Sequence, residues 1–252
     1  MVSDCGISFL SLQELKATNV SHRDFAKFWG NKNFGLDYVD SVGQSGGLIC
    51  AWDDKVFCQS GGSKNRYYLH VRGSLLGCAS PVNVLNVYAP QGLSAKKSLW
   101  EELKMVIDSF DGLWVISGDF NVVRFREEKR NCAFKQNCAN NFNDFIFESG
   151  LIEYNMRGRM FTFRSDNGNK LSKLDRFLVN SEFFSAWPAA SCRVLPRDRL
   201  KEWKEIMIKK EGEEVMAAKE ENEKLEDVLD SRDFSEEEEW IFHENKKIIC
   251  EA

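Results

Sequence analysis

Hydrophobic and polar positions alternate in short runs along the first two thirds of the chain, and most of these runs predict strands. Several runs begin or end at a glycine or proline, which is typical of strand boundaries. The predicted strands are Ile7–Leu12, Gly46–Trp52, Tyr67–Arg72, Val82–Tyr88, Leu113–Ile116, Phe161–Arg164 and Leu174–Val179.

Two stretches between these strands have helical spacing. Ser94–Phe110 repeats apolar residues at intervals of three and four, and Asn141–Ser149 does the same before Gly150. Many strands with two or three inserted helices predict an α/β sandwich, in which two sheets pack together with the helices outside.

The pattern changes after residue 198. Leu200–Met207 carries an apolar stripe among Lys and Glu, and Ser235 followed by four Glu predicts the capped, acidic start of another helix. We therefore expect a domain at 1–198 and a charged helical tail at 199–252. A partly disordered tail is the alternative.

Charge divides in the same place. Residues 1–198 hold 24 Lys and Arg against 21 Asp and Glu, a net charge of +3, whereas residues 199–252 hold 10 against 18, a net charge of −8. A surface that binds phosphate must therefore belong to residues 1–198, and the acidic tail should repel nucleic acid.

Composition narrows the class of protein further. With 252 residues, 43% of them hydrophobic, the chain can bury a sizeable core. The eight scattered cysteines form no CxxC pair and are interpreted as reduced, mostly buried thiols. Neither a signal peptide nor an apolar run long enough to span a membrane is present. We expect an intracellular protein, in the nucleus or the cytoplasm, without a membrane partner.

The candidate chemistry lies directly behind the apolar run Leu113–Ile116, in Gly118-Asp119-Phe120-Asn121. A strand that ends in this way delivers a carboxylate and an amide, two residues apart, to the same side of the chain. Carboxylate and amide oxygens suit Mg²⁺, and the amide can also hold a phosphate. The alternative is an ordinary turn after a buried strand.

Six motifs follow one another in an order that gives this turn more weight. They are Gln13-Glu14-Leu15-Lys16, Ser45-Gly46-Gly47-Leu48, Asn86-Val87-Tyr88-Ala89-Pro90, Gly118-Asp119-Phe120-Asn121, Phe161-Thr162-Phe163 and Leu174-Asp175-Arg176-Phe177. Over residues 5–197 this order resembles the endonuclease/exonuclease/phosphatase superfamily, whose fold is DNase I-like. More narrowly, it is similar to the apurinic-type endonuclease domain of plant LINE-type (non-LTR) retrotransposons.

The resemblance implies a role for each matching residue. Glu14 is implied as the metal ligand, Tyr88 as a contact to the reacting phosphate, and Asp119 as the acid that handles the proton of water or leaving group. Asn121 is implied as the amide that holds phosphate, and Asp175 as the aspartate that the family pairs with a catalytic histidine. The implied cofactor is Mg²⁺, with Mn²⁺ as a substitute. The implied partners are DNA and a reverse transcriptase on the same polyprotein, and we expect a monomer.

The sequence departs from the family at both ends of the domain. The opening asparagine strand is missing, and the chain jumps at Arg199-Leu200 past the Ser-Asp-His strand, so we expect an incomplete sandwich. The only histidines are His22, His70 and His243, and none follows Ser-Asp. Since an acid–base group contributes about 10²–10⁴ to a rate, we expect catalysis to be strongly slowed.

Four functions stay open at this point. The first is a Mg²⁺-dependent phosphodiester hydrolase that nicks DNA, and the second is a catalytically inactive relic of that domain with residual nucleic-acid or protein binding. The third is a binding module that uses the basic loop Arg124–Arg130 and exposed aromatics. A phosphatase or lipid phosphodiesterase is the fourth, disfavoured by the last two motifs.

Overall fold

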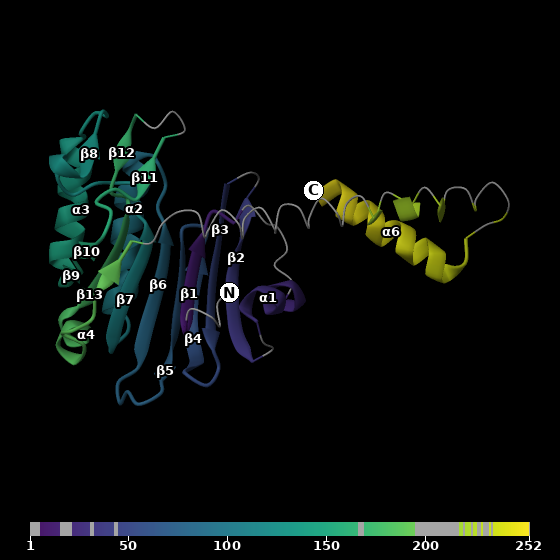
Figure 1. The fold of residues 1–252 in the computed structure, drawn as a ribbon, viewed down its shortest axis with the longest axis horizontal. Helices are drawn as coiled ribbons and strands as arrows, with labels where there is room; N and C mark the ends of the chain where they lie inside the picture. Colours follow the sequence, from purple (N-terminus) through teal and green to yellow (C-terminus); the bar gives the residue numbers. More distant parts are fainter. Residues whose placement is uncertain are drawn as a thin grey trace. The chain divides into compact units, whose positions relative to one another are not determined.

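The computed structural model of the chain describes residues 6–15, 22–30, 33–42, 45–165 and 169–194. Beyond residue 194 it describes 217–218, 220–222, 224–225, 228, 232 and 234–251. The chain forms two compact units, residues 1–194 and 195–252, and each is treated by itself (Figure 1).

A six-stranded sheet forms the centre of the first unit, in the order β4-β5-β6-β7-β13-β9. Strands β6 and β7 run parallel, because helix α2 carries the chain back between them, and the other neighbours are antiparallel. The strands are β4 (Phe57–Asn65), β5 (Tyr68–Leu75), β6 (Val82–Tyr88), β7 (Leu113–Asp119), β9 (Leu151–Glu153) and β13 (Asp175–Asn180).

A second, antiparallel sheet has the order β1-β3-β2, formed by β1 (Phe9–Gln13), β2 (Phe34–Val42) and β3 (Ser45–Asp53). Two small sheets complete the unit. One joins β8 (Lys129–Arg130), β11 (Phe163–Arg164) and β12 (Leu171–Ser172), and the other pairs β10 (Met156–Arg157) with β14 (Cys192–Arg193).

Three hydrophobic clusters stack these elements into layers. Helices α2 (Leu93–Asp108) and α3 (Gln136–Glu148) cover one face of the six-stranded sheet, and its other face packs on β3. Helix α1 (His22–Trp29) covers the far side of β3 (Figure 1). The alternation of β3 explains this double packing, since Leu48, Cys50 and Trp52 face one cluster while Ile49 and Ala51 face the other. The predicted α/β sandwich is confirmed.

One buried amide ties the two sheets together. Asn86 of β6 is fully buried, and its Nδ2 donates to the carbonyl oxygens of Leu12 (2.9 Å) and Ile49 (3.0 Å) in the other sheet. Its Oδ1 accepts a hydrogen bond from Gln13. Because a buried amide without partners is costly, this set of contacts fixes how the carboxyl end of β1 sits against β6.

In the second unit, α6 (Glu236–Glu251) begins as the sequence predicts. The Ser235 hydroxyl accepts from the Glu238 backbone N–H (3.3 Å), and the Glu238 carboxylate accepts from the Ser235 N–H (2.9 Å), which makes a capping box. Leu200–Met207 lies outside the described residues, as does the predicted boundary at 198, so that division stays a prediction. No helix in the described parts of the chain has the length and apolarity to span a membrane.

The structure differs from the sequence prediction in several elements. Helices α1 and α4 (Ser181–Ala186) and strands β2 and β4 were not predicted, and the strand expected at Phe161–Arg164 is only two residues long. The expectation of mostly buried thiols is wrong: of the six cysteines described, all free, Cys50 alone is buried. Cys58 is exposed, since β4 is the edge strand of its sheet.

Candidate functional site

Three neighbouring strands place predicted site residues side by side at one rim of the six-stranded sheet. Tyr88 at the end of β6 pairs with Asp119 at the end of β7, and Asp119 pairs with Asp175 at the start of β13. Gly118 makes this register feasible, because a Cβ atom there would lie 2.0 Å from the Val87 carbonyl oxygen. The glycine before the aspartate is thus a packing requirement of the parallel pair.

Glu14 reaches the same rim from the other sheet. It directly follows β1, and its carboxylate accepts a hydrogen bond from the Tyr88 hydroxyl. Burial raises the pKa of Tyr88, and the hydrogen bond to Glu14 raises it further. The phenol therefore stays protonated and acts as a donor.

Asn121 is held by its neighbours on every side. Its backbone N–H donates to Asp119 Oδ1 (2.7 Å), its Nδ2 donates to the Ala89 carbonyl oxygen (2.7 Å), and its Oδ1 accepts from Gln91 Nε2 (2.6 Å). An amide nitrogen carries two protons, so one remains to donate to a ligand.

Backbone strain marks two of these positions. Only Glu14 (φ 56°), Asn121 (φ 50°) and Asn131 (φ 55°) have positive φ among the described residues other than glycine. Such conformations cost energy and concentrate at functional sites, and a glutamate there is less common than an asparagine.

The carboxylates at this rim repel one another. Burial raises the pKa of Asp119 to about 7, and the charges of Asp175 and Glu14 add to this shift. The Asn121 N–H and the more distant Lys96 oppose it without cancelling it. A cation placed here would relieve the repulsion, which is the arrangement expected of a metal-binding rim.

The donor set fits a hard cation that keeps much of its water. No group of three His, Cys, Asp or Glu side chains in the described residues is arranged to enclose a metal ion. Mg²⁺ is commonly held by one or two carboxylates together with water and substrate phosphate oxygens. The exposed Glu14 carboxylate, with Asp119 and Asp175 behind it, meets that requirement.

The motif Phe161-Thr162-Phe163 positions Asp175. The Thr162 hydroxyl accepts hydrogen bonds from the backbone N–H groups of Leu174 (2.9 Å) and Asp175 (3.0 Å), where β13 begins. The Thr162 hydroxyl thus fixes the backbone at the start of the Leu174-Asp175-Arg176-Phe177 motif.

The histidines of the first unit have other surroundings. His22 stacks on Phe34 with ring centroids 4.3 Å apart. His70 is fully buried in β5, where its Nε2 lies 3.1 Å from Asn83 Oδ1 and its ring stacks on Trp114. His243 belongs to α6 of the second unit. The contacts of His22 and His70 are thus with residues of the fold that are not among the candidate site residues.

Sequence reasoning missed two residues that hold the site. Gln91 bonds the Asn121 amide, and Lys96 Nζ donates to the backbone oxygens of Asn121 (2.7 Å) and Gln91 (3.2 Å). Lys96 is only 5% exposed and shares the buried face of α2 with Leu99 and Leu103. A lysine at an apolar position of that helix was the available signal.

A buried ion-pair cluster stands next to the rim. Arg176, with no exposed side-chain surface, bonds both oxygens of Glu128 (3.0 and 2.5 Å) and one of Glu153 (2.7 Å). Arg124 and Lys173 also bond Glu153, at 2.8 and 2.7 Å. The loop expected to offer a basic surface at Arg124–Arg130 therefore uses Arg124 and the buried Glu128 internally.

The fold is shared with several nucleases of known structure. An AP endonuclease from Leishmania major superposes with a TM-score of 0.60 at 16% identity, covering 73% of each chain. The endonuclease domain of TRAS1, a telomere-specific non-LTR retrotransposon, gives 0.54 at 13% identity, covering 73% of this chain and 78% of that one. This chain has the endonuclease/exonuclease/phosphatase fold.

A third structure with this fold is the catalytic domain of APE2 from Xenopus laevis, with a TM-score of 0.53 at 13% identity, covering 72% of this chain and 76% of that one. No protein-family model and no curated protein matches the sequence. At these identities the likeness concerns the endonuclease/exonuclease/phosphatase fold, and the chemistry has to be argued from the residues at the rim.

Proposed function

We propose that the chain is a Mg²⁺-dependent phosphodiester hydrolase that nicks DNA. The observation that carries the proposal is the convergence of three carboxylates, Glu14, Asp119 and Asp175, on one phenol and one amide at the rim of β6, β7 and β13. A cluster of carboxylates beside phosphate-directed donors is typical of phosphoryl-transfer sites that use a divalent cation.

Each residue has a role that its surroundings support. Glu14, with Asp119 and Asp175 nearby, would hold Mg²⁺ or Mn²⁺, which supplies positive charge to the non-bridging oxygens of the phosphate. The remaining Nδ2 proton of Asn121 would donate to the phosphate. Tyr88, kept protonated, gives its single proton to Glu14 and would turn it toward the phosphate once Glu14 holds the metal ion. Asp175 completes the acidic environment that tunes Asp119.

Asp119 is the residue suited to proton transfer. Without a bound cation its pKa is raised to about 7, and once Mg²⁺ lowers that pKa the ionised carboxylate can accept the proton of the attacking water. In the hydrolysis, a water oxygen bonds to phosphorus, the bond from phosphorus to the leaving oxygen breaks, and the proton of the water is passed on to the leaving oxygen. Asp119 would hold that proton in transit.

DNA is the substrate that the structural neighbours favour, since an AP endonuclease and a retrotransposon endonuclease share this fold. We propose that the chain acts as a monomer and derives from a polyprotein that also carried a reverse transcriptase. Domain 1–198 would bind DNA, and the acidic segment 199–252 would stay away from it.

Slow catalysis is part of the proposal, because the sequence has no Ser-Asp-His motif after Asp175. An inactive relic that retains nucleic-acid or protein binding is the second candidate, and the same absence favours it. A measurement of DNA nicking separates the slow hydrolase from the inactive relic.

The decisive assay is nicking of supercoiled plasmid in Mg²⁺, with the unaltered chain, Asp119→Asn, and a chain in which a Ser-Asp-His strand is restored between Arg199 and Leu200. The proposal expects slow nicking that EDTA and Asp119→Asn abolish, and a gain of about 10²–10⁴ on restoration. No nicking by the unaltered chain, with intact folding, would establish the relic. Nicking that survives Asp119→Asn would refute the proposed site.

A further inference from the structure

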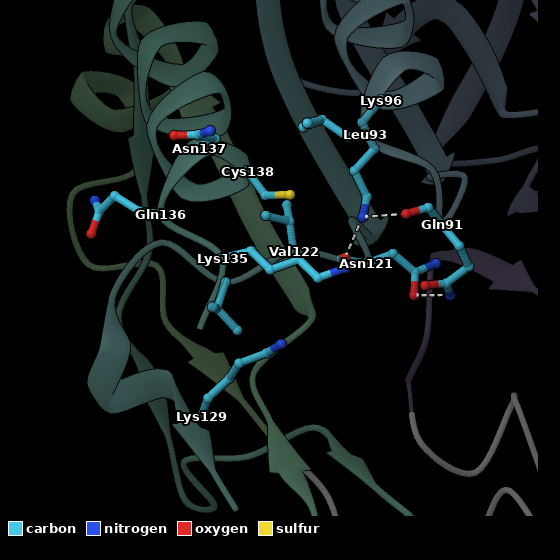
Figure 2. A pocket seen from close by; sticks show the side chains of 11 residues that line it. Gln91, Leu93, Lys96, Asn121, Val122, Lys129, Lys135, Gln136, Asn137 and Cys138 are labelled. Carbon is cyan, nitrogen blue, oxygen red and sulfur yellow. Dashed lines mark hydrogen bonds between the residues drawn. The ribbon is translucent and has the colours of Figure 1, made fainter. Parts of the chain in front are cut away.

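A pocket of about 460 Å³ opens beside Asn121, and three of the residues that line it are Lys96, Lys129 and Lys135. Figure 2 shows these side chains extending toward the pocket from α2, from β8 and from the residue just before α3. None of the described residues that line it is acidic. We call it the three-lysine pocket.

The charges of the three lysines act on one another. Burial lowers the pKa of Lys96, and the charges of Lys135 and Lys129 also lower it, whereas Cys138 and Asp119 oppose the shift. The Lys96 ammonium spends two of its three protons on the backbone oxygens of Asn121 and Gln91, as Figure 2 shows. Positive charge thus accumulates at the pocket, where an anion would relieve the repulsion.

Two helix N-termini meet at the same pocket. Helix α2 starts at Leu93 after Gly92, α3 starts at Gln136 after Lys135, and both first residues line the pocket. Neither helix has a side-chain cap or an acidic residue in its first turn. Their first backbone N–H groups and partial positive charges therefore remain available to an anion.

The three-lysine pocket adjoins the candidate catalytic rim through Asn121. The backbone oxygen of Asn121 accepts from Lys96 at the pocket, while its side-chain amide bonds the Ala89 carbonyl and Gln91 (Figure 2 shows the contact with Gln91). One residue thus belongs to both places, so an anion in the pocket would be a close neighbour of a phosphate at the Asn121 amide.

We propose that the three-lysine pocket binds a backbone phosphate of the DNA strand next to the phosphate that is cleaved, and so fixes the position of the strand along the rim. The choice of DNA rests on the proposed function, whereas the affinity for a phosphate group rests on the pocket. Contacts to phosphate carry no base information, so the pocket contributes affinity and alignment without sequence preference.

The test is DNA binding without catalysis. Fluorescence anisotropy with a labelled duplex, in EDTA and between about 50 and 200 mM salt, compares the unaltered chain with Lys129→Gln/Lys135→Gln. The matched control is Lys55→Gln/Lys97→Gln, which removes the same charge from exposed positions outside the pocket. We expect the pocket variant to lower the salt slope of the affinity by about one, and the control to change it far less.

Two further arms separate the alternatives. Calorimetry with inorganic phosphate tests whether the pocket is a site for free phosphate. If the pocket variant loses phosphate binding while every variant keeps the same affinity for DNA, the proposal is overturned. Equal salt slopes for pocket variant and control overturn it as well, even if plasmid nicking is normal. A lysine-dependent slope in a chain that never nicks DNA supports the pocket and refutes only the hydrolysis.

Discussion

Two acidic clusters meet β13 at the neighbouring residues Asp175 and Arg176, and they differ in how the pKa values of their buried carboxyl groups are shifted. Glu128 and Glu153 surround Arg176, and although burial alone would raise their pKa values, their hydrogen bonds and the charge of Arg176 lower both. Within the described part of the chain, Lys96 is the cation that lowers the pKa of Asp119, but burial and the charges of Asp175 and Glu14 outweigh it, and that pKa rises to about 7. Neighbouring residues of one strand, Arg176 and Asp175, thus serve a structural and a candidate functional cluster.

The difference indicates what each cluster is for. A buried ion-pair network in which both carboxylates are paired with cations holds loops together, and removing one member exposes the cost of burying the others. A cluster of like charges lowers stability, and a cation that binds there would relieve the repulsion. The predictions below alter one cluster at a time.

The largest expected effect follows from Arg176→Met. This change leaves Glu128 and Glu153 buried without their main cation, and we expect it to destabilise the chain by about 3–5 kcal/mol. Urea unfolding followed by circular dichroism measures it. A loss below about 1 kcal/mol would mean that Lys173 and Arg124 alone satisfy both carboxylates.

Asp119→Asn should raise the free energy of unfolding, in contrast to Arg176→Met. The folded-state pKa of Asp119 lies above its unfolded value of about 3.9, so the native state of the unaltered chain holds this proton longer and loses stability as pH rises from about 4 to 7. After allowance for solvent screening, the variant should be more stable at pH 8 by about 1–3 kcal/mol. Unfolding curves at pH 5 and pH 8 check this, and equal pH dependence in both proteins would contradict it.

Acid should act on the other cluster. The lowered pKa values of Glu128 and Glu153 mean that their contribution is fully present above about pH 4.3 and is lost as pH falls through the folded-state values. Glu128→Gln should therefore flatten the acid limb of the stability profile while leaving the slope of stability between pH 5 and 7 unchanged. If Asp119→Asn flattened the acid limb and Glu128→Gln did not, the acid sensitivity would come from the Asp119 cluster, which would contradict this prediction.

The smallest effect is expected on the surface. Lys104 and Glu148 bridge α2 and α3 at 2.6 Å, with side chains 39% and 55% exposed. Exposed pairs contribute about 0–1 kcal/mol, so Lys104→Ala should shift the urea midpoint little, in contrast to Arg176→Met. A shift as large as that of Arg176→Met would remove the distinction between buried and exposed pairs.

The sequence predicted the parts of the molecule that depend on local pattern. Val82–Tyr88 appears with the predicted bounds, since β6 is buried on both faces, mostly by apolar residues, and bounded by prolines. Helix α1 was missed because its apolar residues, among them Phe25 and Trp29, occupy only two turns, too few to show a period.

For the site, motif order identified the five residues that the structure brings together. It did not identify their supports, because Lys96, Gln91 and Arg176 act through contacts distant in sequence, such as Arg176 with Glu128. Propensity and spacing carry no information about such pairs. The three-lysine pocket was missed for the same reason, since its lysines come from three separate elements.

The central proposal is that Mg²⁺ binds beside Asp119 and relieves the repulsion that raises the pKa of its carboxyl group. Carboxylate NMR of the aspartate side chains, with Asp119 assigned by its loss in Asp119→Asn, measures that group directly. The account predicts a pKa near 7 without divalent cation and a clearly lower value in saturating Mg²⁺, with Glu14→Gln weakening the shift. An Asp119 pKa that stays the same in Mg²⁺ would contradict the claim.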